Sequence, residues 1–397
     1  MKILTLSTYP VKVPEHGGQH RVHNIVDAFK KAGHTVQSCG VLGSPNYPQE
    51  EGFAPFPGVD ILRRYLPEPA VMEDWAISQL FRNDEKFFKQ LSDLIDGIPD
   101  VIHCEQPWLF GFALKYIKKI QKKSIKIIYG SQNIECDLKV SIVKRWMGLE
   151  RAELYRPLVL DCEKEAIISS DLVVCVSEHD AKWAEQFNPS CKIVVAANGV
   201  VDRLAAVEDI LRANRMTGGR KFTLFCASAH LPNIEGFFDI FGDGAGCFPP
   251  NSHLVVAGSA GHGISHNPQF ISCAGLSRPY MDAGIVSESL LTGLIKTAHT
   301  IILPITQGGG TNLKTAEALW SGKHVVATSK AMRGFEKFIG SSGISVVDQP
   351  SLFLKEVCKS MLDRPHSIGI EERVRRREVL WDLTLEPLIE AVDKLGR

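Results

Sequence analysis

Three consecutive glycines followed by a lysine and a glutamate form the part of the sequence best suited to chemistry. Gly308, Gly309 and Gly310 have no Cβ, so the backbone there can take a positive φ and approach a ligand closely. Exposed N–H groups at the start of a following helix bind anions, usually phosphate, and Lys314 adds a positive charge beside them. Glu317, nearly one turn further, is suited to accept hydrogen bonds from two neighbouring hydroxyls, such as a ribose diol. The pattern predicts a site for a nucleotide diphosphate.

A strand and a helix are expected to position these residues. The apolar run Ile301–Leu303 predicts a parallel strand that is covered on both faces. Thr311 or Asn312 is a suitable N-cap for the helix that follows, and Gly322 is expected to end it. Because glycine-rich loops are common, the alternative is a flexible loop beside a solvated helix face that carries the lysine and the glutamate.

Length, charge and cysteine content restrict the class of protein. With 397 residues the chain is expected to form two domains. The 45 basic and 45 acidic residues balance, which argues against a nucleic-acid binder with a general basic field. No apolar run reaches membrane-spanning length, and the first apolar stretch is too short for a signal peptide. The ten cysteines include no C-x-x-C pair, so reduced thiols in a cytoplasmic protein are favoured over disulfides or a metal site.

The chain reads as two similar α/β halves. The first opens with a strand, Lys2–Ser7, and a helix, Gln19–Ala32, and it lacks the G-x-G-x-x-G pattern of nicotinamide dinucleotide sites. Asp202–Arg220 is polar and ends in two glycines, as expected of a linker, and the strand-helix pattern restarts after it. Glu371–Leu395 predicts a final long helix. The predicted domains are 1–200, 201–370 and a C-terminal helix in 371–397.

Polar residues in the first half are candidates for further binding contacts. Gly17 and Gly18 come just before the first helix and make a second candidate anion site, with Arg21 in the first helical turn. Open α/β sheets bind ligands at the carboxyl ends of their strands. The polar and aromatic residues that follow two later strands are therefore expected at the site: Glu105, Trp108, Gln132, Asn133 and Glu135.

A lysine-rich helix lies between these two groups. Its basic residues are Lys115, Lys118, Lys119, Lys122 and Lys123. They form either a solvated face or a contact with anionic lipid headgroups or a lipid-phosphate acceptor. The solvated face is favoured because no strongly amphipathic apolar face accompanies the lysines.

Three motifs together resemble a known family. They are Gly17-Gly18 after the first strand, Asn198-Gly199-Val200 before the linker, and the stretch from Gly308 to Thr328. With them the chain resembles the retaining nucleotide-sugar glycosyltransferases of glycosyltransferase family 4 along nearly its whole length. The resemblance implies the GT-B fold, an α/β architecture of two Rossmann-like doubly wound domains that face each other across a cleft. It also implies that the final helix crosses back to the first domain.

The resemblance assigns roles to residues of this chain. It implies that Glu317 binds the donor ribose and that the amides around Thr311, Asn312 and Leu313 hold the diphosphate. The expected catalytic residues are Lys314, Thr311, Asn312 and Gln132. The expected donor contacts are Gly17, Gly18, Arg21, Ser228, Asn233, Ile285, Glu288, Gly309, Gly310, Leu313 and Glu317. The expected acceptor contacts are Glu105, Trp108, Asn133 and Glu135.

Three positions depart from the family pattern. Gly309 stands where the first glutamate of the family's Glu-x7-Glu pair is found, and Gln132 stands where a histidine is often found. The segment Ser228–Asn233 replaces a basic pair that usually follows the first strand of the second domain. Lys314 and Arg21 would then have to neutralise the diphosphate.

The expected activity is retaining transfer of a hexosyl group from a nucleotide diphosphate sugar. The acceptor is expected to be a carbohydrate or a lipid-linked glycan, in polysaccharide or glycoconjugate biosynthesis in the cytoplasm, with peripheral contact to the inner membrane face as a further expectation. There is no Asp-x-Asp and no histidine pair with a carboxylate, so neither a metal nor another cofactor is expected. The alternatives are a degenerate, non-catalytic partner protein that binds a nucleotide or glycan, and a sugar-nucleotide epimerase on the same fold.

Overall fold

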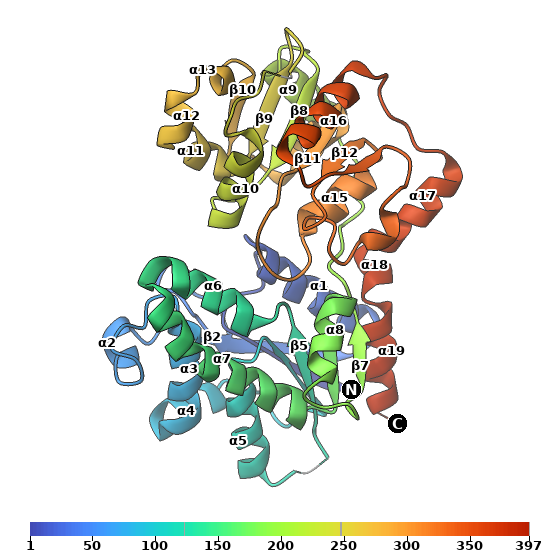
Figure 1. The fold of residues 1–397 in the computed structure, drawn as a ribbon. Coiled ribbons are helices and arrows are strands. Elements are labelled where there is room, and N and C mark those ends of the chain that lie inside the picture. Colours follow the sequence, from blue (N-terminus) through green and yellow to red (C-terminus); the bar gives the residue numbers. More distant parts are fainter. Residues whose placement is uncertain (123, 247, 397) are drawn as a thin grey trace. The chain divides into compact units, whose positions relative to one another are not determined.

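The chain forms two compact units. The computed structural model describes residues 1–122, 124–246 and 248–396; Lys123 of the expected lysine-rich helix lies outside this range. One unit comprises Met1–Ala197 together with Thr384–Arg397, and the other comprises Asn198–Leu383. Figure 1 labels the elements, and helices flank the sheet of each unit.

Within the described residues, the first unit contains a parallel seven-stranded sheet in the order β3-β2-β1-β4-β5-β6-β7. Its strands are β1 (Lys2–Ser7), β2 (Thr35–Val41), β3 (Phe53–Ala54), β4 (Val101–Glu105), β5 (Lys126–Ser131), β6 (Leu172–Cys175) and β7 (Ile193–Val195). Its helices are α1 (Gly17–Lys31), α2 (Val59–Leu62), α3 (Glu73–Asn83), α4 (Glu85–Ser92), α5 (Phe110–Ile120), α6 (Glu135–Met147), α7 (Leu149–Ser169), α8 (Glu178–Glu185) and α19 (Glu386–Leu395).

The second unit has a parallel six-stranded sheet in the order β10-β9-β8-β11-β12-β13, counted over its described residues. Its strands are β8 (Phe222–Cys226), β9 (His253–Ala257), β10 (Tyr280–Gly284), β11 (Thr300–Leu303), β12 (His324–Ala327) and β13 (Ile344–Val346). Its helices are α9 (Val207–Met216), α10 (Leu231–Phe241), α11 (Ala260–Ser265), α12 (Pro268–Ser272), α13 (Ala274–Ser277), α14 (Glu288–Thr297), α15 (Leu313–Ser321), α16 (Pro350–Leu362) and α17 (Ile370–Arg376), with short 3-10 turns at Glu336–Phe338 and Arg377–Val379. The short helix α18 (Trp381–Thr384) leads to α19.

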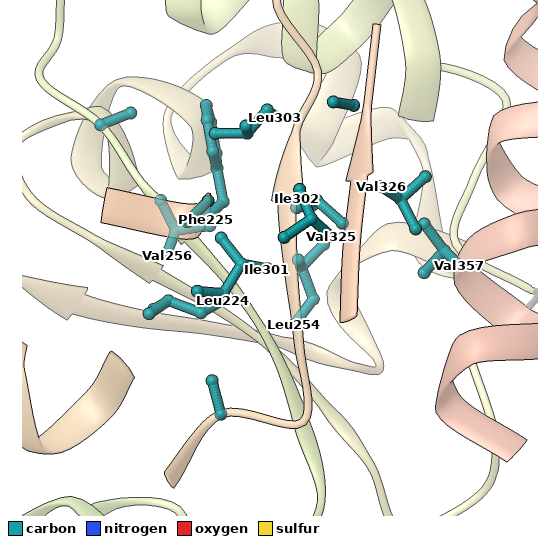
Figure 2. Packing of buried hydrophobic residues seen from close by; sticks show 14 of the residues in the cluster. Leu224, Phe225, Leu254, Val256, Ile301, Ile302, Leu303, Val325, Val326 and Val357 are labelled. Atoms are coloured by element: carbon teal, nitrogen blue, oxygen red, sulfur yellow. The ribbon is translucent and has the colours of Figure 1, made fainter. Parts of the chain in front are cut away.

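The strands are apolar on both faces because helices cover both faces of each sheet. Strand β11 is buried at every residue, as the run Ile301–Leu303 predicts. Figure 2 shows these residues packed against β8, β9, β12 and α16 through side chains such as Leu224, Val256, Val325 and Val357. This packing fixes the end of β11, and therefore the start of the glycine loop that follows it.

The expected long helix Glu371–Leu395 is wrong as one continuous element. The chain instead forms α17, a 3-10 turn, α18 and α19. Leu380 is extended and pairs in parallel with Val200, and Pro387 lies in the first turn of α19, where its missing N–H costs nothing. Helix α19 packs against β7 and belongs to the first unit.

Candidate functional site

The N-terminus of α15 carries the triple-glycine motif. Asn312 is the N-cap, and its Oδ1 accepts a hydrogen bond from the Lys314 amide at 3.1 Å. Gly308 and Gly310 have φ values of +109° and +62°, a region that residues with a Cβ rarely adopt. The main-chain oxygen of Gly310 accepts a hydrogen bond from Arg333 Nε at 2.6 Å. The loop is therefore shaped by glycine and anchored at its end, while Gly308 and Gly309 are exposed.

Lys314 is held by Asn233, which lies in the first turn of α10. Its Nζ donates to Asn233 Oδ1 at 3.2 Å, and Asn233 Nδ2 donates to the Ser228 main-chain oxygen at 3.0 Å. The first turn of α10 reaches this place because Gly236 packs directly on the Pro304 main-chain oxygen, where a Cβ would overlap it. Burial lowers the pKa of Lys314. Three predicted residues from two segments, Lys314 of α15 and Ser228 and Asn233 around the start of α10, thus lie near one another.

Glu317 lies on α15, three residues beyond Lys314. It is partly buried, and it makes no hydrogen bond or ion pair with another residue that the structure describes. Burial raises the pKa of its carboxyl group, against the positive charges of Lys314 and Arg203. A sheltered carboxylate whose oxygens are not used inside the protein is suited to a ligand's hydroxyls.

The loop after β10 and the start of α14 contain two of the predicted donor contacts, Ile285 and Glu288. Ser287 is the N-cap of α14 and accepts from the Leu290 amide at 3.3 Å. Glu288 is exposed and forms an ion pair with Arg203 at 3.0 Å, and Ile285 is 85% exposed. Both predicted residues therefore lie at the surface of the second unit. Their part in binding stays a prediction.

Two residues to which the sequence analysis gave no role, Asn198 of the predicted motif and Arg376, hold the glycine loop and its helix. Asn198 Nδ2 donates to the Thr311 main-chain oxygen at 3.1 Å, so the Asn198-Gly199-Val200 motif fixes the start of α15. Arg376 is fully buried and donates to the Leu319 main-chain oxygen at 2.9 Å and to the Ser342 main-chain oxygen at 2.7 Å. Glu372, one turn earlier on α17, accepts a hydrogen bond from Arg376 Nε at 2.7 Å. The i, i+4 spacing of Glu372 and Arg376 in the sequence could have predicted this ion pair.

In the first unit, α1 begins at the predicted glycine pair. A Cβ on Gly18 would lie 2.9 Å from both Gln132 Oε1 and Tyr9 Oη, so the missing side chain lets α1 approach these groups. Gln132 Nε2 donates to Glu105 Oε1 at 3.1 Å and also to Tyr9 Oη. The glycine pair thus serves close packing around Gln132.

Arg21 lies in the interior rather than at an anion site facing solvent. It is 1% exposed, its Nε donates to Glu105 Oε1 at 2.9 Å, and its Nη1 donates to the Ala196 main-chain oxygen at 2.9 Å. His103 Nε2 lies 3.0 Å from Glu105 Oε2. Burial raises the pKa of Glu105, but Arg21 and His103 outweigh it and hold the pKa at about 2. The Arg21 guanidinium therefore neutralises a buried carboxylate of its own unit.

The remaining predicted acceptor residues surround the start of α6. Glu135 Oε1 accepts from Gln106 Nε2 at 3.1 Å and from Asn133 Nδ2 at 3.3 Å, and burial raises its pKa. Glu163, which the sequence did not single out, accepts from the amides of Glu135 and Cys136, each at 2.7 Å. Trp108 is 1% exposed and packs in an apolar cluster. Glu105 and Trp108 are therefore interior residues in this structure, and direct contact with an acceptor is not what their surroundings favour.

Further expectations from the sequence concerned metal sites, cysteines, membrane-spanning helices and the lysine-rich helix. No group of three His, Cys, Asp or Glu side chains suited to a metal occurs within residues 1–122, 124–246 and 248–396. The nine cysteines that the structure describes are free thiols. None of the described helices combines the length and apolar character needed to cross a bilayer. Lys115 and Lys119 of the basic helix are paired with Glu85.

Comparison with known proteins supports the family resemblance in part. The family model for Glycosyltransferase Family 4 matches residues 16–203, which lie almost entirely in the first unit. No curated protein sequence matches the chain.

Solved structures resemble the whole chain. Sucrose-phosphate synthase from Thermosynechococcus elongatus has a TM-score of 0.72 at 14% identity, covering 100% of this chain and 99% of that one. An α,α-trehalose-phosphate synthase from Burkholderia xenovorans, in complex with glucose-6-phosphate, has a TM-score of 0.64 at 13% identity, with 100% and 99% covered. Anabaena HepE, in complex with UDP, has a TM-score of 0.61 at 12% identity, with 99% and 100% covered. At these identities the likeness establishes the fold alone, and this chain has the predicted GT-B fold of two Rossmann-like units.

Proposed function

We propose that the chain is a retaining glycosyltransferase that moves a hexosyl group from a nucleotide diphosphate sugar to a carbohydrate or lipid-linked glycan acceptor. The observation that carries the proposal is the N-terminus of α15. There Lys314 is held by Asn233, and Glu317 is sheltered with no partner among the described residues. The match of residues 16–203 to a glycosyltransferase family model supports the same activity.

The donor is proposed to bind along the first turns of α15. The glycine loop lets the diphosphate approach the free amides of Thr311, Asn312 and Leu313, because the first N–H groups of a helix have no partner within it. Glu317 accepts hydrogen bonds from the ribose hydroxyls. Lys314 lies between these two places and contributes positive charge.

Negative charge grows on the diphosphate as the bond between sugar and phosphate oxygen breaks. Donors that are already oriented toward this oxygen stabilise the transition state more than the ground state. Lys314 and the amides are assigned this role. In a retaining reaction the acceptor hydroxyl attacks from the face that the phosphate leaves, and a phosphate oxygen takes its proton. The reaction then needs no strong protein base, which is consistent with Gln132 in place of a histidine.

The likeness to known structures guides the choice of ligands. HepE was solved with UDP and the Burkholderia enzyme with glucose-6-phosphate, so UDP-sugars come first in a donor panel. Metal independence and a cytoplasmic location are further parts of the proposal. Activity in EDTA and co-sedimentation with anionic vesicles test whether the chain needs a metal and whether it contacts a membrane.

A binding protein without catalysis is the second candidate. The observation that favours it is the composition of the proposed phosphate site, where the segment Ser228–Asn233 stands in place of a basic pair and Gly309 in place of a glutamate. In that case the interaction of Lys314 with Asn233 would be structural. An epimerase on the same fold is distinguished by its product.

One experiment separates these functions. Nucleoside diphosphates with uracil, guanine and adenine are first screened by thermal shift, since a ligand that binds only the native state raises the melting temperature. The matching nucleotide sugars are then incubated with the protein and a panel of acceptors. Transfer with retained anomeric configuration supports the proposal. Binding without turnover favours the binding protein, and free nucleotide with an epimerised sugar indicates an epimerase.

A further inference from the structure

A polar cavity of about 240 Å³ lies in the first unit at the carboxyl end of its sheet. Its wall includes Thr8, just after β1, Gly43, just after β2, and Gln106, just after β4. This edge is where open parallel sheets bind ligands. Because one water molecule takes about 30 Å³ of liquid volume, the cavity has room for a ligand the size of one sugar ring.

Thr8 lines this cavity, and its hydroxyl has no hydrogen-bond partner among the described residues. The residue is 2% exposed. Gly43 keeps this place open, since a Cβ there would lie 2.8 Å from the Thr8 main-chain oxygen and 3.2 Å from Asp74 Oδ1. Buried hydroxyls in proteins normally have partners. The Thr8 hydroxyl is therefore available to a ligand that occupies the cavity.

The charge of the wall is negative. Glu73 and Asp74, at the start of α3, line the cavity, and Gln106 bonds the buried carboxylate of Glu135 behind it at 3.1 Å. No lysine or arginine is among the described lining residues. The cation beside the cavity is Lys139, whose Nζ is already engaged by Asp74 Oδ2 at 2.8 Å and by the Val71 main-chain oxygen at 3.0 Å. Because Lys139 already pairs with Asp74, a phosphate or carboxylate in the cavity would be repelled mainly by the carboxylate of Glu73.

Neutral rings complete the wall. His16 Nε2 lies 3.1 Å from Tyr47 Oη, and the rings of Tyr9 and His16 meet edge to face at 5.2 Å between centroids. Burial lowers the pKa of His16 to about 4 and raises the pKa of Tyr47 to about 12. Both groups are therefore uncharged at neutral pH. Ligand sites commonly combine aromatic surfaces with a few placed polar groups in this way.

We propose that this cavity binds one sugar unit of the acceptor and that this unit is uncharged, with hydroxyls and no phosphate or carboxylate. The carboxylates of Glu73 and Asp74 accept hydrogen bonds from the hydroxyls, and the Thr8 hydroxyl supplies a further bond. The same carboxylates reject the phosphorylated form of the sugar. The acceptor role rests on the proposed function, whereas the charge preference rests on the cavity.

The test uses the full chain with glucose, galactose and mannose and with their 6-phosphates, by ligand-observed NMR and competition. At least one neutral hexose is expected to bind, with its 6-phosphate at least ten-fold weaker. Thr8→Val keeps the shape of the side chain and removes the hydroxyl, so it should lower the affinity for the neutral hexose by about 3- to 10-fold. Glu73→Gln should weaken binding of the neutral hexose by a similar factor. It should also reduce the difference in affinity between the hexose and its 6-phosphate. Glu150→Gln, on the exposed surface of α7, is the matched control and should leave both affinities unchanged.

Several results would overturn the inference. These are a 6-phosphate that binds as tightly as its hexose, no hexose binding, or hexose binding that neither variant changes. Thermal shift by nucleoside diphosphates is measured on the same samples, which also shows that the variants are folded. Nucleotide protection without hexose binding rejects this inference and leaves the proposed function standing. Hexose binding with the expected charge preference but without nucleotide protection supports the cavity site and rejects the proposed donor.

Discussion

Replacing Glu317 by alanine is the most direct perturbation of the proposed donor site. In the free protein this carboxylate is partly buried and has no hydrogen-bond partner among the described residues. The ribose hydroxyls would therefore be its main partners when the donor binds. A hydrogen bond to a charged group contributes about 1.5–3 kcal/mol. Two such bonds that share one carboxylate are not additive, so we expect a loss of about 2–3 kcal/mol, or roughly 30- to 150-fold in Kd.

The same substitution should not destabilise the protein. Burial raises the pKa of Glu317 above its value in the unfolded chain, so the folded state disfavours the charged form. The ionised carboxylate therefore opposes folding at neutral pH, and this unfavourable effect disappears as the pH falls below the folded-state pKa. Removing the carboxylate at pH 7 should leave the melting temperature unchanged or slightly higher.

Calorimetry and thermal unfolding test both statements. Kd is measured for the nucleoside diphosphate that gives the largest thermal shift, with the intact chain, Glu317→Ala and Glu371→Ala. Glu371 is an exposed carboxylate of α17 in the same unit and serves as the control. An unchanged Kd for Glu317→Ala would refute the ribose assignment. A melting temperature lowered by several degrees would instead give Glu317 a structural role.

Three further substitutions test other parts of the site and fold. Lys314→Ala should lower kcat more than donor affinity, whereas Lys355→Ala, at an exposed lysine of α16, is the control and should change neither. A loss of donor affinity with kcat unchanged would mean that Lys314 acts only in ground-state binding. Glu105→Gln should lower the free energy of unfolding by about 3–5 kcal/mol, because the buried charge of Arg21 loses its partner. The depressed pKa of Glu105 stabilises the fold above the unfolded pKa, so in acid titration the intact chain should lose this stability as the pH falls from about 4.5 to about 2, and the variant should not. Arg376→Met should lower the melting temperature, because the main-chain oxygens of Leu319 and Ser342 lose their hydrogen-bond donor. An unchanged melting temperature would contradict the stabilising role of Arg376.

Local sequence signals predicted β11, the glycine loop and the start of α15 well. The run Ile301–Leu303 predicted a covered strand, and Asn312 had the chemistry of an N-cap. Gly308 and Gly310 have positive φ, as a glycine loop before a helix suggests. These features depend on a residue and its near neighbours in the chain. That is why one sequence was enough to predict them.

Long-range partners were beyond such reasoning. Gly17, Gly18 and Arg21 form a helix start that looks like an anion site in sequence, but Arg21 is buried against Glu105, 84 positions away. The same limit applies to Glu163, which bonds the first amides of α6 from the middle of the following helix. Periodicity shows which face of a helix is buried, but it does not show which charge it meets.

The buried pair in the first unit also changes how the missing histidine is understood. Gln132 is one of the groups that hold Glu105, together with Arg21 and His103, and Gly130 has no room for a Cβ beside this carboxylate. An uncharged amide at position 132 donates to Glu105 without adding a further titratable group beside Glu105 and His103. Gln132 therefore supports this end of the sheet, which agrees with our proposal that Lys314 and the first amides of α15 stabilise the leaving phosphate.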